Sequence, residues 1–189
     1  MIEKFHTPRM RQFTIEQFVA QSEGHWRSMR TGHSLAFQQF EEIISDVTIQ
    51  SLEPNTEPVV RLLDKHSIPY NDSIRPFIMR WEADSDWEPD NPADSLKGEC
   101  ILVPIKTDDE NGHFIRSVGY AEAEEATSSY SISSDGTIHL KTIYGGSIAE
   151  ERIWFVSDNV RCRSSVIRTS EGSGVIQTSF ASEIRRIKI

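Results

Sequence analysis

Two arginines, Arg161 and Arg163, flank Cys162 in a strand-like segment near the end of the chain. Because successive side chains of a strand point to opposite faces, both guanidinium groups leave one face and the thiol leaves the other. A guanidinium binds a carboxylate through two parallel N–H bonds, so an enclosed pair would suit a ligand that carries carboxylates. If that face points to water instead, the pattern is only a solvated surface. Cys162 fits a small outward hydrophobe better than a nucleophile.

A carboxylate lies shortly before these arginines, in the run Glu150-Glu151-Arg152. A carboxylate buried near Arg161 and Arg163 would stay ionised and could orient the arginines or accept a proton. The alternative is a surface ion pair, which is worth only about 0–1 kcal/mol. The run therefore supplies a candidate acid or base whose role depends on burial.

A second candidate group lies near the N-terminus, where Trp26 and Arg30 share one face of a predicted strand. His33 lies on the other face unless Gly32 forms a bulge that returns it to the first. An inward Arg30 beside His33 would offer both a carboxylate grip and a proton shuttle. The alternative is an edge strand with solvated charges.

Two tryptophans, Trp81 and Trp87, frame the acidic segment 84–90. Burial alone would explain Trp81, whereas Trp87, among acidic residues, could either pack or cover a flat conjugated ligand. The segment is not a calcium loop, because Pro89 replaces the turn glycine and Ser95 replaces the bidentate glutamate. The six histidines show no ligand spacing, so we expect no metal site.

The elements that would position these residues are mainly strands. A capping box at Thr14 and Gln17 predicts a short N-terminal helix, and Pro58 with an apolar stripe predicts a second over 57–66. The remaining strand-like segments are 25–32, 35–44, 46–52, 74–82, 98–106, 113–122, 130–133, 137–143, 149–155, 160–169 and 175–187. Strands and helices do not alternate as in βαβ units, so we predict an all-β fold. Because closure leaves no exposed sheet edge, the simplest arrangement is one antiparallel barrel of about ten strands, forming a single domain over residues 1–189.

Composition limits the partners. The chain has 189 residues, 37% hydrophobic and 26% charged, with a net charge of −9. This excess of acid argues against nucleic-acid and anionic-membrane partners. No run reaches the roughly 18–20 apolar residues of a membrane span, and no signal peptide is visible. Two cysteines without CxxC spacing fit a reducing compartment, so we expect a cytoplasmic protein, or a stromal one if the gene is in a plastid.

Five sequence blocks, taken in order, resemble the S-type phycobiliprotein lyases. They comprise Trp26, Ser28, Arg30, Thr31 and His33; Trp81 and Trp87; Glu150, Glu151, Arg152, Trp154 and Phe155; Asn159, Arg161, Arg163 and Ser164; and Ser179, Phe180, Ser182, Glu183, Ile184 and Arg185. The resemblance spans nearly the whole chain. It implies a lipocalin-like, fatty-acid-binding-protein-like barrel that binds a linear tetrapyrrole (bilin), such as phycocyanobilin or phycoerythrobilin, without a covalent bond.

The resemblance also implies an activity: the bilin is delivered to a cysteine of a phycobiliprotein apo-subunit, where a thioether forms. The bilin is then the substrate, and no cofactor is expected. Such proteins are cyanobacterial or plastid, and some work as a homodimer or as a heterodimer with a paralogue. A non-catalytic bilin carrier or a partner subunit of a heterodimeric lyase is the alternative, and a carrier of another acid, such as a fatty acid, is a third hypothesis.

Residue roles follow from the resemblance. Substrate contacts are expected from cations that hold the bilin propionates and from aromatic rings that hold one conformer: Arg30, Arg161, Arg163, Trp81, Trp87 and Trp154. Glu151 and His33 are expected to manage protons during thioether formation. The attacking thiolate belongs to the acceptor, so Cys100 and Cys162 need no catalytic role. The chain departs from the family pattern at Gly32, where the family often has serine, and over residues 172–178.

Overall fold

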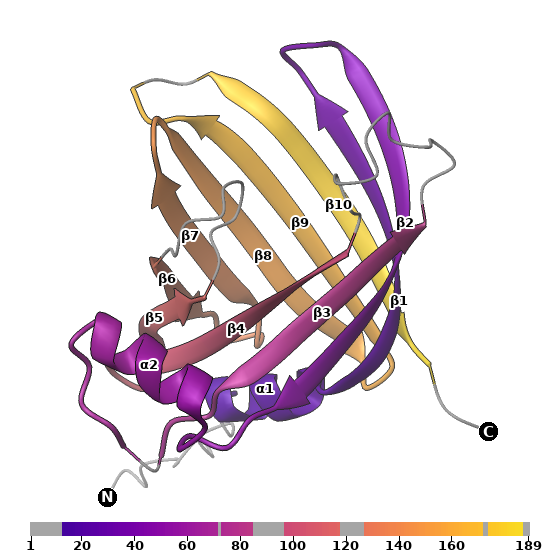
Figure 1. Cartoon of the computed structure of the whole chain (residues 1–189). Coiled ribbons are helices and arrows are strands. Elements are labelled where there is room, and N and C mark those ends of the chain that lie inside the picture. Colours follow the sequence, from indigo (N-terminus) through magenta and orange to yellow (C-terminus); the bar gives the residue numbers. More distant parts are fainter. Residues whose placement is uncertain (1–12, 72, 85–96, 118–126, 172–173, 187–189) are drawn as a thin grey trace, which may run out of the picture.

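Ten antiparallel strands close into a barrel in the computed structural model, which describes residues 13–71, 73–84, 97–117, 127–171 and 174–186. Each strand pairs with its neighbour in the chain, and β1 pairs with β10 to close the sheet (Figure 1). The strands are β1 Gly24–Ser34, β2 Gln39–Ser51, β3 Phe77–Asp84, β4 Lys97–Lys106, β5 Asn111–Arg116, β6 Thr127–Ile132, β7 Ile138–Tyr144, β8 Ser147–Ser157, β9 Val160–Thr169 and β10 Val175–Arg185. The predicted all-β antiparallel barrel is thus confirmed.

Helix α1, Ile15–Ser22, lies across one end of the barrel (Figure 1). The predicted capping box is present: the Gln17 backbone N–H donates to the Thr14 side chain, and the Gln17 side chain accepts from the Thr14 backbone N–H. The helix buries Phe18 and Val19 in the main hydrophobic core, together with Trp26. This end of the barrel is therefore filled by apolar side chains.

Helix α2, Glu57–Lys65, lies outside the barrel. Its buried residues Val59, Leu62 and Leu63 form a second core with Val103 and Ile115, which point outward from β4 and β5. The helix thus covers part of the outer surface and leaves the interior free of its side chains.

One prediction about the strands was wrong. Segments 35–44 and 46–52 were expected to form two strands, but β2 runs unbroken over 39–51. Ser45 does not interrupt it, because this residue pairs with Ser28 on one side and Ala83 on the other. The turn falls earlier, where Gln38 adopts a left-handed conformation with φ of 53°.

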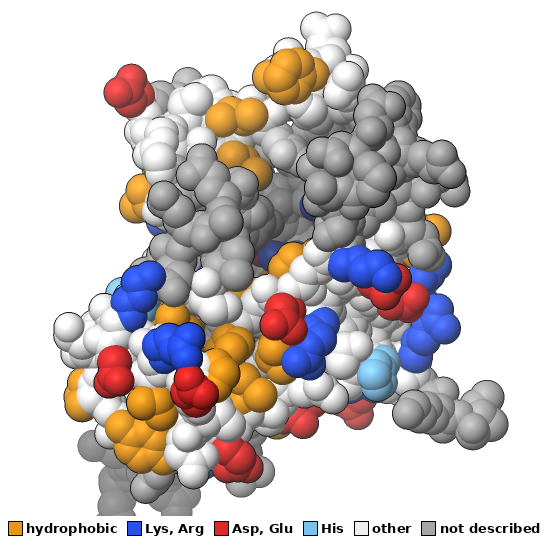
Figure 2. Space-filling view, viewed as in Figure 1, with side chains coloured by type: hydrophobic (Ala, Val, Ile, Leu, Met, Phe, Trp, Pro, Cys, Tyr) orange, Lys and Arg blue, Asp and Glu red, His pale blue; other side chains and the backbone are white. Residues whose placement is uncertain are grey.

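The end of the barrel opposite α1 carries the β1–β2 and β9–β10 connections (Figure 1). In the space-filling view the molecule is hollowed on this side, and basic and hydrophobic side chains are visible in the hollow (Figure 2). No helix in the described part of the chain is long and apolar enough to cross a membrane. A ligand would have to enter the barrel from the end that α1 does not fill.

Candidate functional site

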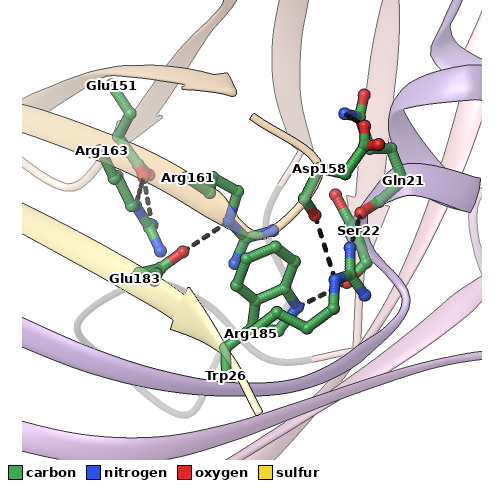
Figure 3. Close-up of polar contacts among 9 residues, drawn as sticks. All are labelled: Gln21, Ser22, Trp26, Glu151, Asp158, Arg161, Arg163, Glu183 and Arg185. Atoms are coloured by element: carbon green, nitrogen blue, oxygen red, sulfur yellow. Dashed lines mark hydrogen bonds and ion pairs between the residues drawn. The ribbon is translucent and has the colours of Figure 1, made fainter. Parts of the chain in front are cut away.

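Charged side chains occupy the inner face of three adjoining strands, β8, β9 and β10. Strand register places Arg161 directly opposite Glu183, and it places Arg163 diagonally from Glu151. The same strand parity that predicted a shared face for the two arginines therefore directs both into the barrel. Figure 3 shows these side chains converging between the strands.

Arg161 and Glu183 form a buried ion pair. The guanidinium Nε donates to Glu183 Oε2 at 2.5 Å, and the two side chains are only 6% and 5% exposed. Burial lowers the pKa of Arg161 from its usual value, while the charge and hydrogen bond of Glu183 oppose that shift. Arg161 is thus fully engaged within the protein, and its interactions hold β9 and β10 together.

Trp26 connects this pair to the end closed by α1. The guanidinium carbon of Arg161 lies 4.9 Å from the centre of the Trp26 ring, and that of Arg185 lies 4.2 Å from it. Arg185 also donates to the backbone oxygens of Gln21 and Asp158 (Figure 3). Two cations over one ring, together with these bonds, fix the C-terminal end of α1 against β10.

The second ion pair, Arg163 with Glu151, is more open. Nε of Arg163 donates to Glu151 Oε2 at 2.6 Å, and its Nη2 donates to the same oxygen. The Arg163 side chain is 28% exposed, whereas that of Glu151 is 1% exposed. Glu151 Oε1 is buried and has no hydrogen-bond partner among the described residues. A buried carboxylate oxygen without a donor is costly, so this atom is placed to receive a proton or a hydrogen bond from a ligand.

A third inward cation, Arg30, lies further toward the open end. Its Nη2 contacts Glu41 Oε1 at 3.2 Å, and the two side chains are 41% and 50% exposed. Glu41 lies directly opposite Gly32, where a Cβ would come within 2.8 Å of Glu41 Oε1. The missing side chain at Gly32 therefore leaves the space through which the Glu41 carboxylate reaches Arg30.

Trp81 lies on the inner face of β3, partly buried against the main core. Its indole lies over Gly98 on β4, where a Cβ would overlap the ring. Gly98 thus lets the ring lie close to the sheet. Trp87, the other predicted aromatic contact, lies outside the described residues.

Two predicted site residues are not brought to the interior. The bulge that would turn His33 inward is absent, because β1 pairs without interruption with both neighbours; the exposed His33 contacts Phe40 on the outer face. Trp154 also points outward, since it lies three residues from the inward Glu151, and its ring lies 6.2 Å from that of Phe180. Strand alternation separates both residues from the inner arginines.

Cys162 lies on the outer face, as predicted. Burial, and then the charge of Glu183, raise the pKa of its thiol, which disfavours the thiolate form. Among the described residues, no group of three His, Cys, Asp or Glu side chains could hold a metal ion.

Sequence reasoning missed two partners, Glu183 and Glu41. In the structure Glu183 shares the inner face of β10 with Arg185, whose guanidinium lies over Trp26; strand parity groups these two residues but does not tell which face is the inner one. The pairing of Glu183 with Arg161 depends on the register between two strands, and that register cannot be predicted from either segment alone. The same holds for Glu41 and Arg30.

Comparison with known proteins agrees with this architecture. The family described as CpeS-like protein matches residues 14–186. The chain is 45% identical over 173 residues to the chromophore lyase CpcS/CpeS 3 of Trichodesmium erythraeum, covering 90% of this chain and 98% of that protein. It is 40% identical over 159 residues to the putative phycoerythrobilin lyase CpeS of Microchaete diplosiphon, covering 82% and 70% of the two chains. The solved S-type phycobiliprotein lyase CPES of Guillardia theta superposes with a TM-score of 0.80 and 32% identity, covering 96% of each chain.

Proposed function

The chain belongs to the family of CpeS-like proteins, and from this premise we propose that it is a bilin lyase. It binds a linear tetrapyrrole non-covalently and attaches it through a thioether to a cysteine of a phycobiliprotein subunit. The observation that carries the proposal is the Arg163–Glu151 pair, which combines a partly exposed cation with a buried, incompletely bonded carboxylate inside a barrel closed at one end.

The inner cations suit the two propionates of a bilin. Arg163 and Arg30 keep part of their guanidinium surface exposed, so each can take one carboxylate in a charge-assisted hydrogen bond. Arg161 is almost fully buried, its Nε donates to Glu183 and its guanidinium lies over the Trp26 ring, so we assign it a supporting role beside the site. Trp81 presents an inner aromatic surface on which a conjugated ring system can stack.

Thioether formation is an addition. The acceptor thiolate forms a bond to the ethylidene carbon of ring A, the electron pair of the C=C bond moves into the conjugated system, and the tetrapyrrole takes up a proton. The elements of S–H are thus added across a double bond, and no group leaves. Glu151 is the inner group that can hold or move that proton, with Arg163 keeping the carboxylate oriented. Most of the remaining acceleration comes from holding the bilin in one orientation.

Bilin binding tests the function. Adding phycocyanobilin or phycoerythrobilin to the protein should red-shift and sharpen the absorption spectrum. Arg163→Ala should weaken the affinity about 10–100-fold, the equivalent of one charge-assisted hydrogen bond. Arg168→Ala is the matched control, because Arg168 pairs with Glu150 outside the barrel. A bilin spectrum that does not change on addition of micromolar wild-type protein would contradict the proposal. Equal losses of bilin affinity in the two variants would contradict the role of Arg163.

Glu41 competes with the ligand for Arg30. An exposed ion pair is worth about 0–1 kcal/mol, so Glu41→Gln should tighten bilin binding by up to about fivefold. Glu99→Gln, which breaks the exposed pair with Arg80 on the outer face, should leave the affinity unchanged. Spectroscopic titration at fixed ionic strength measures both. Weaker binding by Glu41→Gln would instead mean that Glu41 helps to present Arg30.

We further propose that the protein acts in the cyanobacterial cytoplasm or the plastid stroma, without a cofactor besides its bilin substrate. We propose that it works as a homodimer or with a paralogue. Supporting an assembly, four apolar side chains are exposed on adjoining outer parts of β1, β2 and β10: Met29, Ile44, Phe180 and Ile184. Burying such a surface favours association.

A further inference from the structure

A groove of about 670 Å³ runs across the outer face of β5 to β9. Its position outside the barrel follows from strand alternation: Leu140 and Glu151 point inward and are buried, so their chain neighbours point outward. The outward side chains that line the groove are mainly basic or hydroxyl-bearing, among them His113, Ser129, Ser131, His139, Lys141 and Arg152, and its lining also includes the carboxylate of Glu150. Arg152 belongs to the same sequence run as Glu151, yet it lies on the opposite side of the barrel wall.

The two cations in this groove differ from the others in the described part of the chain. Every other arginine described there makes a hydrogen bond, an ion pair or another electrostatic contact, whereas Arg152 makes none. Among the lysines that the structure describes, only the side chain of Lys141 lacks a hydrogen bond, an ion pair or another electrostatic contact. In a chain of net charge −9 carboxylates are abundant, so two unpaired cations in one groove are unexpected for an ordinary surface.

Register brings the two cations together. Lys141 on β7 lies opposite Glu150 on β8, and Arg152 follows two residues later, so Lys141 and Arg152 are diagonal neighbours at about 7–8 Å. Glu150 does not neutralise Lys141, because its carboxylate pairs with Arg168. The groove therefore presents two adjacent positive charges flanked by hydroxyl donors, an arrangement that matches carboxylates spaced along a chain.

The shape favours a protein segment over a small molecule. Small-molecule sites are mostly enclosed clefts, whereas this groove is partly open and spread over five strands, with charged and hydroxyl-bearing side chains around an apolar floor. Arg152 lies five residues from the start of β8, or about 17 Å from the open end of the barrel, a span that one protein partner covers easily. A partner held there could reach the open end at the same time.

We propose that this groove binds an acidic segment of the acceptor protein and orients it toward the open end; the identity of that partner rests on the proposed function. The two cations give a negatively charged protein one local site of attraction on a surface that otherwise repels it. The groove thus contributes to recognition of the acceptor and not to binding of the bilin.

The test reverses both charges in the double variant Lys141→Glu/Arg152→Glu. The apparent KM for the apo-subunit should rise about tenfold and lose most of its salt dependence, with an unchanged affinity for bilin. The matched control, Arg80→Glu/Lys97→Glu, reverses one arginine and one lysine on the outer face of β3 and β4 and should leave that KM near the wild-type value. An unchanged KM in the groove variant, or equal increases in both variants, overturns the inference.

A second measurement does not depend on transfer. A fluorescein-labelled octaglutamate peptide at low ionic strength should bind the wild type and the control variant, with a rise in fluorescence anisotropy, and should not bind the groove variant. Equal binding by all three proteins, or no binding by the wild type, counts against the groove even if lyase activity is present. Loss of bilin binding by the wild type, in contrast, counts against the proposed function alone.

Discussion

Replacing Glu183 by alanine is expected to lower the free energy of unfolding by about 3–5 kcal/mol, because it leaves the buried guanidinium of Arg161 without its counter-charge. Both side chains are almost fully enclosed, so water cannot replace the lost carboxylate. Urea denaturation followed by circular dichroism measures this loss. Glu99→Ala is the matched control, since it breaks an exposed pair with Arg80 and should cost at most about 1 kcal/mol.

A second variant separates the charge effect from simple loss of packing. The double replacement Arg161→Met/Glu183→Leu removes both charges and keeps most of the volume, so its stability should recover much of the loss. If Glu183→Ala costs no more than Glu99→Ala, the buried pair does not stabilise the barrel. The sequence predicted that Arg161 binds a propionate; because Arg161 is buried and contacts Glu183 and Trp26, we propose that it positions β9, β10 and Trp26 instead.

The second large effect concerns Glu151. Glu151→Gln should slow covalent attachment of the bilin about 100-fold or more, because an amide cannot exchange the proton that the addition requires. Non-covalent binding should change only a few-fold, since Arg163 keeps a hydrogen-bond acceptor beside it. Single-turnover transfer to an apo-subunit, with bilin already bound, measures the step directly.

The neighbouring residue supplies the control for this prediction. Glu150→Gln changes the adjacent carboxylate, which points outward and pairs with Arg168. Its transfer rate should remain within a few-fold of the wild type. Equal slowing by both variants, or none by either, would mean that the Glu151 carboxylate does not take part in proton transfer.

Local signals predicted much of the fold. The capping box at Thr14 and Gln17 set the start of α1, because its hydrogen bonds join residues only three apart. Strand alternation correctly placed Arg161 and Arg163 on one face, because it too depends only on residues close together in the sequence. The boundary inside β2 was predicted wrongly, since Ser45 has a polar side chain but pairs with strands on both sides.

The partners of the inner arginines could not be predicted in the same way. Glu183 reaches Arg161 across 22 residues and Glu151 reaches Arg163 across 12, so both pairs depend on the alignment of separate strands. Trp154 shows the opposite case. Its separation of three residues from Glu151 already places it on the other face of the strand, and the alternation rule alone would have excluded it from the interior.

The central claim is that this barrel binds a bilin and transfers it to an acceptor cysteine. The most direct measurement mixes the purified protein with phycocyanobilin or phycoerythrobilin and phycobiliprotein apo-subunits, and then scores colour on denaturing gels. Covalent colour should appear on an apo-subunit, depend on its acceptor cysteine, and fall sharply with Glu151→Gln. A bilin spectrum that changes without covalent colour on any subunit would indicate a carrier, and an absence of both would contradict the account.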